Sequence, residues 1–487
     1  MAKQVGNGAP VCCVFVFILL VMILQLYTDV EPYMDEIYHY PQGLAYCHNK
    51  FHIWDPKITT FPGLYIISYI FKSIVMLPLM ALGISDKNNY ISCSIMYYRG
   101  YNIVLAALSL VLYVECRQNL NPSLDMKIQN WLISIILFLY PLNFFYYFIY
   151  YTDTASTFFL LLVYYLSIKR RREYQIVKES RVKFIVMSIA TFVAAIMAVL
   201  MRQTNAIWIL FIAGTIVIDD LKRSDNYQDT WTNFNVKGFF ELLSMFFRNM
   251  KQLIYYSMPL LLPVLSFIIF ICYNGSIVLG DKENHEISIH FAMPLHMLFI
   301  ASCILYPSDI FNEFKGIVHN GLKITLPSLI GFCIVLYMLY YGSYDHPFLL
   351  SDNRHYMFYI WKRILSHKII RILLVPIYYT VIKLCLVKIA SSKGPMWVLM
   401  YLICVLFNLV PARLLEPRYF TPGIIIMSLN SSNSGIYQFK KIKLNNLFFT
   451  SYFILIVIFV LFNAVSIKIF VYDVFQSDDG RIARFMY

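Results

Sequence analysis

Long apolar runs separated by short polar stretches extend over nearly the whole chain. The first run, VCCVFVFILLVMILQLY at residues 11–27, is followed by further runs of similar length. A helix needs about 20 predominantly apolar residues to cross the hydrocarbon core of a bilayer. The pattern therefore predicts an all-α polytopic membrane protein. The first run is long for the core of a signal peptide and lacks a small-residue cleavage site, so it predicts a retained signal anchor.

The charges in the polar stretches predict the orientation of the chain. KRRREYQIVKESRVK at 169–183 carries seven basic and two acidic residues. Because short cytoplasmic loops collect Lys and Arg, this stretch is expected in the cytosol, together with 221–251 and 440–443. The acidic stretch TDVEPYMDE at 28–36 is expected on the opposite, lumenal side.

One apolar run between these two stretches cannot cross the bilayer. The candidates are 62–83, 94–115, 130–149 and 154–168, and four crossings would return the chain to the lumen. The run 62–83 is the weakest candidate because Lys72 would lie mid-membrane, so we expect it at the membrane surface. Residues 29–93 then form one lumenal loop. The whole chain, 1–487, is predicted to be a single domain with about thirteen transmembrane helices.

Composition excludes some functions. The 40 Lys and Arg residues outnumber the 27 Asp and Glu residues, but they gather in short loops without a nucleic-acid-binding motif. The net charge of +13 is therefore attributed to membrane topology. Most of the ten cysteines lie inside apolar runs, where they act as small hydrophobic residues. Cys47 and Cys93 are both expected in the lumen and could form a disulfide, which the sequence leaves open.

Two adjacent acids follow the first apolar run. EPYMDEIYHY at 31–40 contains Asp35 and Glu36, with His39 close behind. If a helix begins here, Asp35 and His39 lie on one face of it, because they are four residues apart. Solvation of an ordinary interfacial loop also explains such a pair. A metal site is a further alternative, but Asp-x-x-x-His supplies only two ligands, so no metal ion is predicted.

Other polar stretches are expected on the same lumenal side. They are WDPKITTFPG at 54–63, YYTD with Asp153, RQTN with Arg202, DNRHYMFYIWKR at 352–363 and EPRYF at 416–420. Carboxylates that face guanidinium groups across a cleft suggest an acid or base together with a separate anion site. For EPRYF taken by itself, a salt bridge between Glu416 and Arg418 at a helix end is the simpler and favoured explanation.

These motifs occur in an order that resembles a known family. EPYMDEIYHYPQ, WDPKITTFPGLY, YYTD, RQTN, DNRHYMFYIWKR, LLEPRYF and the terminal RFMY together resemble the dolichyl-phosphate-glucose-dependent α-1,2-glucosyltransferases of the endoplasmic reticulum. The resemblance covers about residues 29–487. It implies the GT-C glycosyltransferase fold, with a catalytic acid in the first lumenal loop followed by helices at the membrane surface.

The resemblance also implies a reaction. Glucose would pass, with inversion, from dolichyl phosphate glucose to the diglucosylated oligosaccharide on dolichyl diphosphate, in the endoplasmic reticulum membrane with the active site facing the lumen and without a cofactor. Asp35 is expected to be the base, and Glu36 is the alternative base or an orienting partner. The expected substrate-binding residues are His39, Trp54, Asp55, Asp153, Arg202, Arg354, His355, Tyr356, Trp361 and Arg418. Among them, Arg354, His355 or Arg418 would bind the donor phosphate.

Two alternatives remain open from the sequence. Another GT-C transferase of the same pathway, acting on a different sugar, would keep the same fold and base. A transporter or an accessory subunit of a channel would show charges buried in mid-span and paired helix breaks in related halves. The chain shows no internal repeat, and Lys72 is the exception among charges that otherwise avoid mid-span.

Overall fold

The computed structural model divides the chain into two compact units. Unit 1 contains residues 1–116, 143–212 and 257–285, and unit 2 contains 117–142, 213–256 and 286–487. The structure describes residues 8–81, 93–122, 127–176, 181–223, 236–282, 289–321, 325–346, 349–350, 353–412, 414–432, 443–476 and 482–486. The expected cytosolic residues Lys440 and Lys441 lie outside this part. That the two units act as the single domain expected from the sequence stays a prediction.

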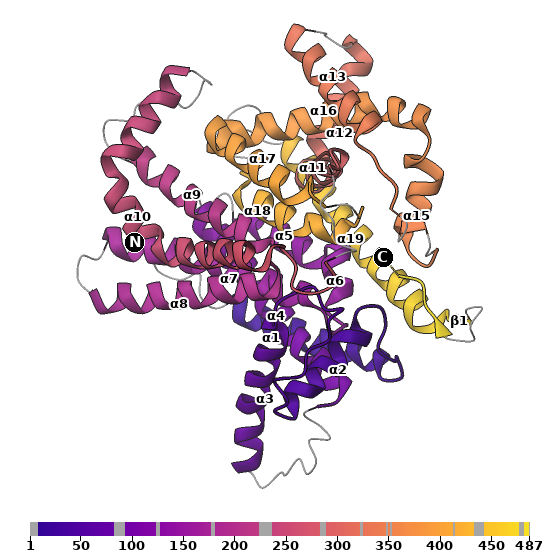
Figure 1. The fold of residues 1–487 in the computed structure, drawn as a ribbon. Coiled ribbons are helices and arrows are strands. Elements are labelled where there is room, and N and C mark those ends of the chain that lie inside the picture. The colour runs from indigo at the N-terminus through magenta and orange to yellow at the C-terminus, as the bar shows by residue number, and fades with distance from the viewer. Residues whose placement is uncertain are drawn as a thin grey trace. The chain divides into compact units, whose positions relative to one another are not determined.

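The regular elements of the described part are nearly all helices (Figure 1). The first helices are α1 (Gly8–Leu24), α2 (Glu36–Cys47), α3 (Gly63–Ala81), α4 (Ile95–Leu120), α5 (Lys127–Leu139), α6 (Pro141–Tyr146), α7 (Thr152–Ile176), α8 (Arg181–Met201) and α9 (Asn205–Arg223). The later helices are α10 (Val236–Asn274), α11 (Ala292–Leu305), α12 (Pro307–Asn320), α13 (Leu326–Tyr341), α15 (Tyr356–Ile360), α16 (Lys368–Lys393), α17 (Pro395–Leu409), α18 (Thr421–Asn430) and α19 (Lys443–Tyr472). Shorter elements are η1 (Gln25–Tyr27), η5 (Trp361–Leu365), η6 (Pro417–Phe420), β1 (Phe475–Gln476) and β2 (Ile482–Ala483).

Six helices in the described part are long and apolar enough to cross a membrane. They are Ala9–Tyr27, Ile95–Leu120, Val182–Met201, Leu253–Asn274, Lys368–Lys393 and Phe449–Tyr472. The pair α11 and α12, which is bent by 100° at its break, is either a broken seventh span or a re-entrant loop. The protein is thus a multi-pass α-helical membrane protein, as predicted, but the expected count of about thirteen is not reached. One reason is that the expected span 130–149 is broken into α5 and α6.

The run that was expected to remain at the membrane surface forms α3. Its described apolar part, Gly63–Val75, is shorter than the helices that qualify as spans. The Lys72 ammonium donates a hydrogen bond to the carbonyl oxygen of Cys47 at 3.1 Å. Cys47 forms a disulfide with Cys93, and their Cα atoms are 6.1 Å apart. The pairing that the sequence left open is therefore present, and it joins the end of α2 to the residues before α4.

Unit 1 is built on helix pairs. α7 and α8 pack side by side along most of their length, and α3 packs against both α2 and α8. The turn between α8 and α9 is fixed by Asn205, whose side-chain amide donates to the Ala198 carbonyl oxygen at 2.7 Å and to the Ser156 hydroxyl at 2.8 Å. These contacts hold the beginnings of α7 and α9 beside the end of α8.

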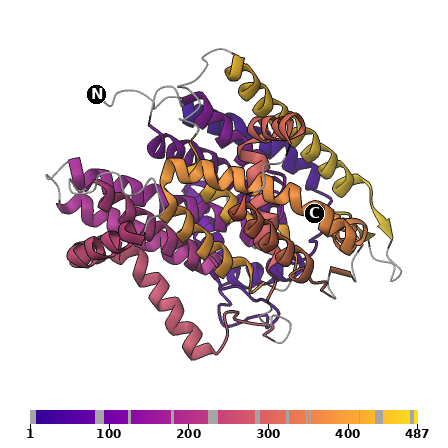
Figure 2. The same cartoon turned by 90° about the horizontal axis from the view of Figure 1, so that it is seen from above.

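In unit 2, α16 packs against α11, α13 and α17, and α19 packs against α5. In Figure 2, α19 (yellow) is one long helix that leads into the antiparallel pair β1–β2. The chain then returns to α15, where His355 and Met486 form a β-bridge. The RFMY and DNRHY motifs, far apart in the sequence, therefore meet within this unit.

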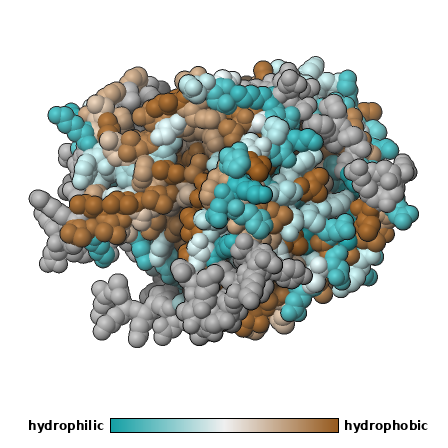
Figure 3. Space-filling model, turned by 60° about the horizontal axis from the view of Figure 1, so that its bottom comes forward, coloured by the Kyte–Doolittle hydropathy of each residue, from teal (hydrophilic) through white to brown (hydrophobic). Residues whose placement is uncertain are grey.

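Large apolar side chains are exposed along several of the candidate spans. They include Val11 and Phe15 of α1, Val182 and Val186 of α8, and Phe453 and Leu461 of α19. The face shown in Figure 3 carries broad hydrophobic areas beside hydrophilic patches. Apolar surface on this scale is unfavourable in water and is what the lipid-facing side of a membrane helix presents.

Candidate active site

The chain turns sharply just before the paired acids. Met34 has a φ angle of 55°, which is rare for a residue with a side chain. Asp35 follows and opens α2, because its carbonyl oxygen accepts the N–H groups of Tyr38 at 3.0 Å and His39 at 2.9 Å. Its carboxylate makes no capping hydrogen bond to the helix. Unusual backbone conformations of this kind concentrate at functional sites, because the surrounding structure has to hold them in place.

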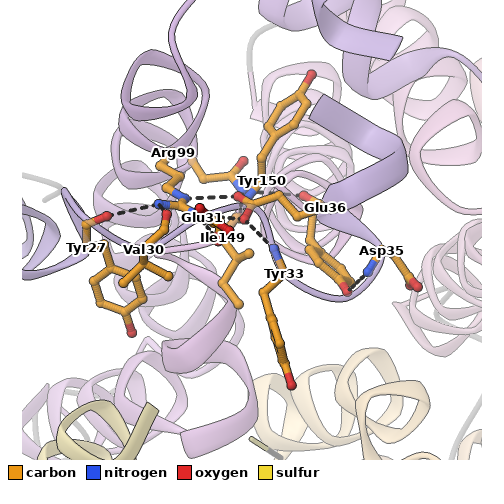
Figure 4. A network of polar contacts seen from close by, with 11 residues as sticks. Tyr27, Val30, Glu31, Tyr33, Asp35, Glu36, Arg99, Ile149 and Tyr150 are labelled. Atoms are coloured by element: carbon orange, nitrogen blue, oxygen red, sulfur yellow. Dashed lines mark hydrogen bonds and ion pairs between the residues drawn. The ribbon is translucent and has the colours of Figure 1, made fainter. Parts of the chain in front are cut away.

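Glu36 is fully buried and its carboxylate is fully engaged. Arg99 donates to Oε1 through Nε at 3.0 Å and to Oε2 through Nη2 at 2.7 Å (Figure 4). The backbone N–H of Tyr150 donates to Oε1 at 2.7 Å, and that of Tyr33 donates to Oε2 at 3.3 Å. A carboxylate with these partners has little capacity left to accept a proton from a substrate. The sequence alternative in which Glu36 is an orienting partner fits this geometry better than a base does.

Arg99 is the residue that sequence reasoning missed. Its side chain is 1% exposed and lies near the start of α4. Besides binding Glu36, its guanidinium donates to the carbonyl oxygens of Tyr27 at 3.0 Å, Val30 at 2.8 Å and Glu31 at 3.3 Å. A charge inside an apolar run normally has a buried partner, and this signal could have identified it.

The backbone of Asp35 is bound by the YYTD motif. Its backbone N–H donates to the hydroxyl of Tyr151 at 2.6 Å. Figure 4 shows its side chain pointing away from the Arg99–Glu36 pair. Asp35 is only partly buried. The two neighbouring acids therefore have different environments: one lies in a closed ion pair, and the other is partly buried and points away from that pair.

His39 is placed next to these residues by the first turn of α2. Its ring is mostly buried, its Nδ1 lies 2.6 Å from the Tyr65 hydroxyl, and its edge packs on the Tyr151 ring. Burial raises the pKa of Tyr65 well above its usual range, with smaller contributions that include the Asp55 and Asp35 carboxylates. The Tyr65 hydroxyl thus remains protonated and shares a short hydrogen bond with His39 Nδ1, in which the donor is set by the tautomer of the ring.

The segment from Trp54 to Thr60 forms a rigid polar turn beside Tyr65. The Asp55 N–H donates to the side-chain oxygen of Gln42 at 2.9 Å, and the Asp55 carboxylate accepts the N–H of Lys57 at 2.9 Å. The Trp54 ring packs edge-on against Tyr65. Trp54 Nε1 and the Thr60 hydroxyl are buried without a hydrogen-bond partner. Because unpaired buried donors are costly, these two atoms are candidate contacts for substrate hydroxyl groups.

A later loop, residues 274–282, binds this turn through the backbone. The N–H of Leu279 donates to the Thr59 carbonyl oxygen at 3.0 Å, and the N–H of Asp281 donates to the Pro56 carbonyl oxygen at 3.1 Å. Gln203 of the RQTN motif also donates to the Thr59 carbonyl oxygen, at 2.8 Å. Together with Gln42 of α2, three separate parts of the chain therefore fix the position of the turn.

Replacing Gly280 by alanine is expected to displace this turn. An added Cβ would lie 2.2 Å from the Pro56 carbonyl oxygen and 2.6 Å from that of Ile58, so the backbone has to move. We expect a loss of about 1–3 kcal/mol in the free energy of unfolding, which is typical of overpacking. Thermal unfolding of the purified protein measures it. Gly316→Ala is the control, since nothing lies near its added Cβ. Equal melting temperatures for the two variants would contradict the close packing.

Two of the predicted substrate-binding residues bind each other. Arg202 Nη2 lies 3.0 Å from the Asp153 carboxylate, and its Nε donates to the Thr152 hydroxyl at 3.3 Å. Their side chains are 15% and 10% exposed. The pair connects the beginning of α7 with the turn after α8 and is mostly buried.

The remaining predicted residues lie in unit 2. His355 caps α15 by accepting the Phe358 N–H at 3.2 Å, and Tyr356 packs edge-on against Phe485. The Trp361 ring is buried in the interior. The carbonyl oxygen of Arg354 accepts the N–H of Met486.

The LLEPRYF motif forms the salt bridge that was the simpler sequence interpretation. Arg418 pairs with Glu416, and its guanidinium also lies over the Tyr419 ring. Both side chains keep some exposure, at 16% and 22%. A part in binding substrate stays a prediction for Arg354, His355, Tyr356, Trp361 and Arg418 alike.

The spans and the polar site of unit 1 define a class: a multi-pass membrane protein with a partly exposed carboxylate at the first helix after its first span. Residues 29–429 match the model of the DIE2/ALG10 family, and the chain belongs to this family.

Curated relatives cover most of the chain. A protein from Arabidopsis thaliana is 27% identical over 99% of this chain and its own full length. One from Homo sapiens is 28% identical over 87% of this chain and 89% of its own, and one from Candida albicans is 30% identical over 85% and 89%. All three are named Dol-P-Glc:Glc(2)Man(9)GlcNAc(2)-PP-Dol alpha-1,2-glucosyltransferase.

Proposed function

We propose that this chain transfers the last glucose of the lipid-linked oligosaccharide. It takes glucose from dolichyl phosphate glucose and attaches it in α-1,2 linkage to the diglucosylated oligosaccharide on dolichyl diphosphate. The observation that carries the proposal is the match to glucosyltransferases of this name along nearly the whole chain. A transporter has no corresponding support, whereas a partly exposed carboxylate beside a rigid polar turn suits a glycosyl transfer.

Asp35 acts as the base in this proposal. The 2-hydroxyl oxygen of the acceptor glucose attacks the anomeric carbon as the bond to the dolichyl phosphate oxygen breaks, and Asp35 takes the hydroxyl proton. Inversion follows from this single displacement. Dolichyl phosphate leaves as a phosphate monoester, which is a good leaving group and needs no general acid. Positive charge on the phosphate stabilises the transition state, and Arg354, His355 and Arg418 are the proposed sources.

Trp54 and Thr60 supply sugar contacts in this proposal. Their unpaired Nε1 and hydroxyl groups can bind hydroxyl groups of glucose, and the indole ring offers a face for stacking. His39, held by Tyr65, is a further proposed contact to a substrate oxygen. Asp55, Asp153 and Arg202 complete the proposed binding set with groups that can still reach solvent.

Replacing Arg418 by alanine is expected to raise the KM for dolichyl phosphate glucose about tenfold or more, since a charged hydrogen bond to phosphate contributes about 1.5–3 kcal/mol. Steady-state kinetics with varied donor and saturating acceptor measure it. Glu416→Gln is the matched control because it removes the partner of Arg418 in the salt bridge and keeps the guanidinium. If both variants raise the donor KM equally, the effect of Arg418→Ala comes from the lost salt bridge and not from a lost contact to the donor phosphate.

We place the active site in the lumen of the endoplasmic reticulum. The Cys47–Cys93 disulfide supports this side for residues 29–93, because disulfides persist in oxidising compartments. A total of about thirteen crossings also requires short apolar helices such as α5, α13 and α17 to cross. Thiols introduced near positions 35 and 418 should both be protected from an impermeant reagent in sealed microsomes. Labelling of only one of them would contradict the shared compartment.

Purified protein with synthetic donor and acceptor tests the function directly. With dolichyl phosphate glucose and the diglucosylated lipid-linked oligosaccharide, we expect a product heavier by one hexose with a terminal α-1,2 linkage. Dolichyl phosphate mannose and the monoglucosylated acceptor serve as controls and should give little product. Preference for either control would assign the chain to another step, and no transfer from any donor would reject the proposal.

A further inference from the structure

Helix α4 supplies two buried side chains, one turn apart, that bind the two segments around Asp35. Arg99 and Asn102 are three residues apart and therefore lie on one face of the helix. Arg99 is 1% exposed and Asn102 is fully buried. No motif recognised in the sequence included either residue.

Arg99 binds the segment that contains the left-handed turn. Its guanidinium contacts the carbonyl oxygens of Tyr27 and Val30 before Met34, and the carboxylate of Glu36 after it. The backbone before the turn and the Glu36 side chain after it are therefore bound to the same guanidinium group. Asp35 lies between Met34 and Glu36, so its backbone has little freedom to move.

Asn102 binds the second segment, residues 149–151. Its side-chain amide donates to the carbonyl oxygens of Ile149 at 2.5 Å and Tyr151 at 3.4 Å. The same segment returns to the acids, because the Tyr150 N–H binds Glu36 and the Tyr151 hydroxyl accepts the N–H of Asp35. The two segments thus bind each other as well as α4.

We propose that Arg99, Asn102 and Tyr151 are positioning residues that set the direction of the Asp35 carboxylate. The proposal rests on the proposed function, in which Asp35 is the base. Because a displacement of about 1 Å in a reacting group can cost about 10²-fold in rate, a backbone fixed on both sides matters for turnover. These residues act through Asp35 and need not touch substrate.

Tyr151→Phe is the sharpest test, because it removes the acceptor of the Asp35 N–H and keeps the ring. We expect kcat to fall about tenfold, the KM values for donor and acceptor to stay within about twofold, and the melting temperature to change little. Asn102→Leu, which preserves side-chain size, should lower kcat at least as much. Tyr101→Phe is the matched control: its hydroxyl is buried on α4 without a partner, so its removal should leave kcat unchanged.

A double-variant experiment separates positioning from general structure. If Tyr151 acts through Asp35, adding Tyr151→Phe to Asp35→Asn should cause almost no further loss of kcat. Full additivity of the two losses in kcat would overturn the proposal. A Tyr151→Phe variant with the same kcat as Tyr101→Phe would also overturn it. So would a change confined to KM.

Hydrogen–deuterium exchange tests the same contact independently of activity. Tyr151→Phe and Asn102→Leu should speed exchange in the peptide that contains residues 30–39, and Tyr101→Phe should not. Faster exchange together with a wild-type protein that fails to transfer glucose would reject the proposed function but retain the positioning. Unchanged exchange in an active enzyme would overturn the positioning alone.

Discussion

Replacing Asp35 by asparagine is expected to lower glucose transfer at least about 10²-fold, as is typical when a general base is lost. Asparagine keeps the size of the side chain but cannot take the proton of the acceptor hydroxyl. The backbone contacts of Asp35 to Tyr151 and α2 do not involve its carboxylate, so folding should be preserved. Turnover of the purified variant with saturating donor and acceptor measures the effect.

Two control variants make this result specific. Asp29→Asn changes an exposed carboxylate of the same segment and should leave turnover unchanged. Asp55→Asn changes the other carboxylate that acts on Tyr65 and should have a smaller effect than Asp35→Asn. Near-normal turnover by Asp35→Asn, or a larger loss with Asp55→Asn, would show that Asp35 is not the base.

Replacing Glu36 by glutamine is expected to act mainly on stability. The change leaves the Arg99 guanidinium buried without its counter-charge. Removing one partner of a buried ion pair costs about 3–5 kcal/mol, so we expect a large drop in the melting temperature of the purified protein. Transfer measured below that temperature should fall less than in Asp35→Asn if Asp35 is the base, as we propose, and Glu36 orients it.

Two further variants test this interpretation of Glu36. Combining Glu36→Gln with Arg99→Met should restore part of the stability, since no unpaired charge is left in the interior. Asp153→Asn breaks the partly exposed pair with Arg202 and should destabilise the protein much less. If Glu36→Gln instead melts normally and loses transfer about 10²-fold, Glu36 is the base.

The sequence singled out the paired acids, but it could not predict that their environments differ. Their partners lie far along the chain: Arg99 is 63 residues after Glu36, and Tyr150 is 114 residues after it. Local spacing identifies which residues share a helix face, and it carries no information on contacts across such distances. The carboxylate that is closed in an ion pair and the one that points away from this pair look equivalent in the sequence.

Apolar run length predicted the all-α membrane class correctly and the number of crossings poorly. Hydropathy shows that a helix is apolar, but not whether it continues in one direction. The chain bends by 100° between α11 and α12, and it breaks between α5 and α6. Likewise, the order of the motifs did not reveal that His355 of one meets Met486 of another.

The left-handed backbone at Met34 limits which residues can occupy that position. Glycine, asparagine and aspartate adopt a positive φ at low cost, whereas branched side chains such as valine and isoleucine are strained there. The stability of variants at position 34 should therefore follow how readily each residue adopts a positive φ, and not how hydrophobic it is. A survey of all twenty residues at this position would rank isoleucine, a close match to methionine in size, among the least acceptable.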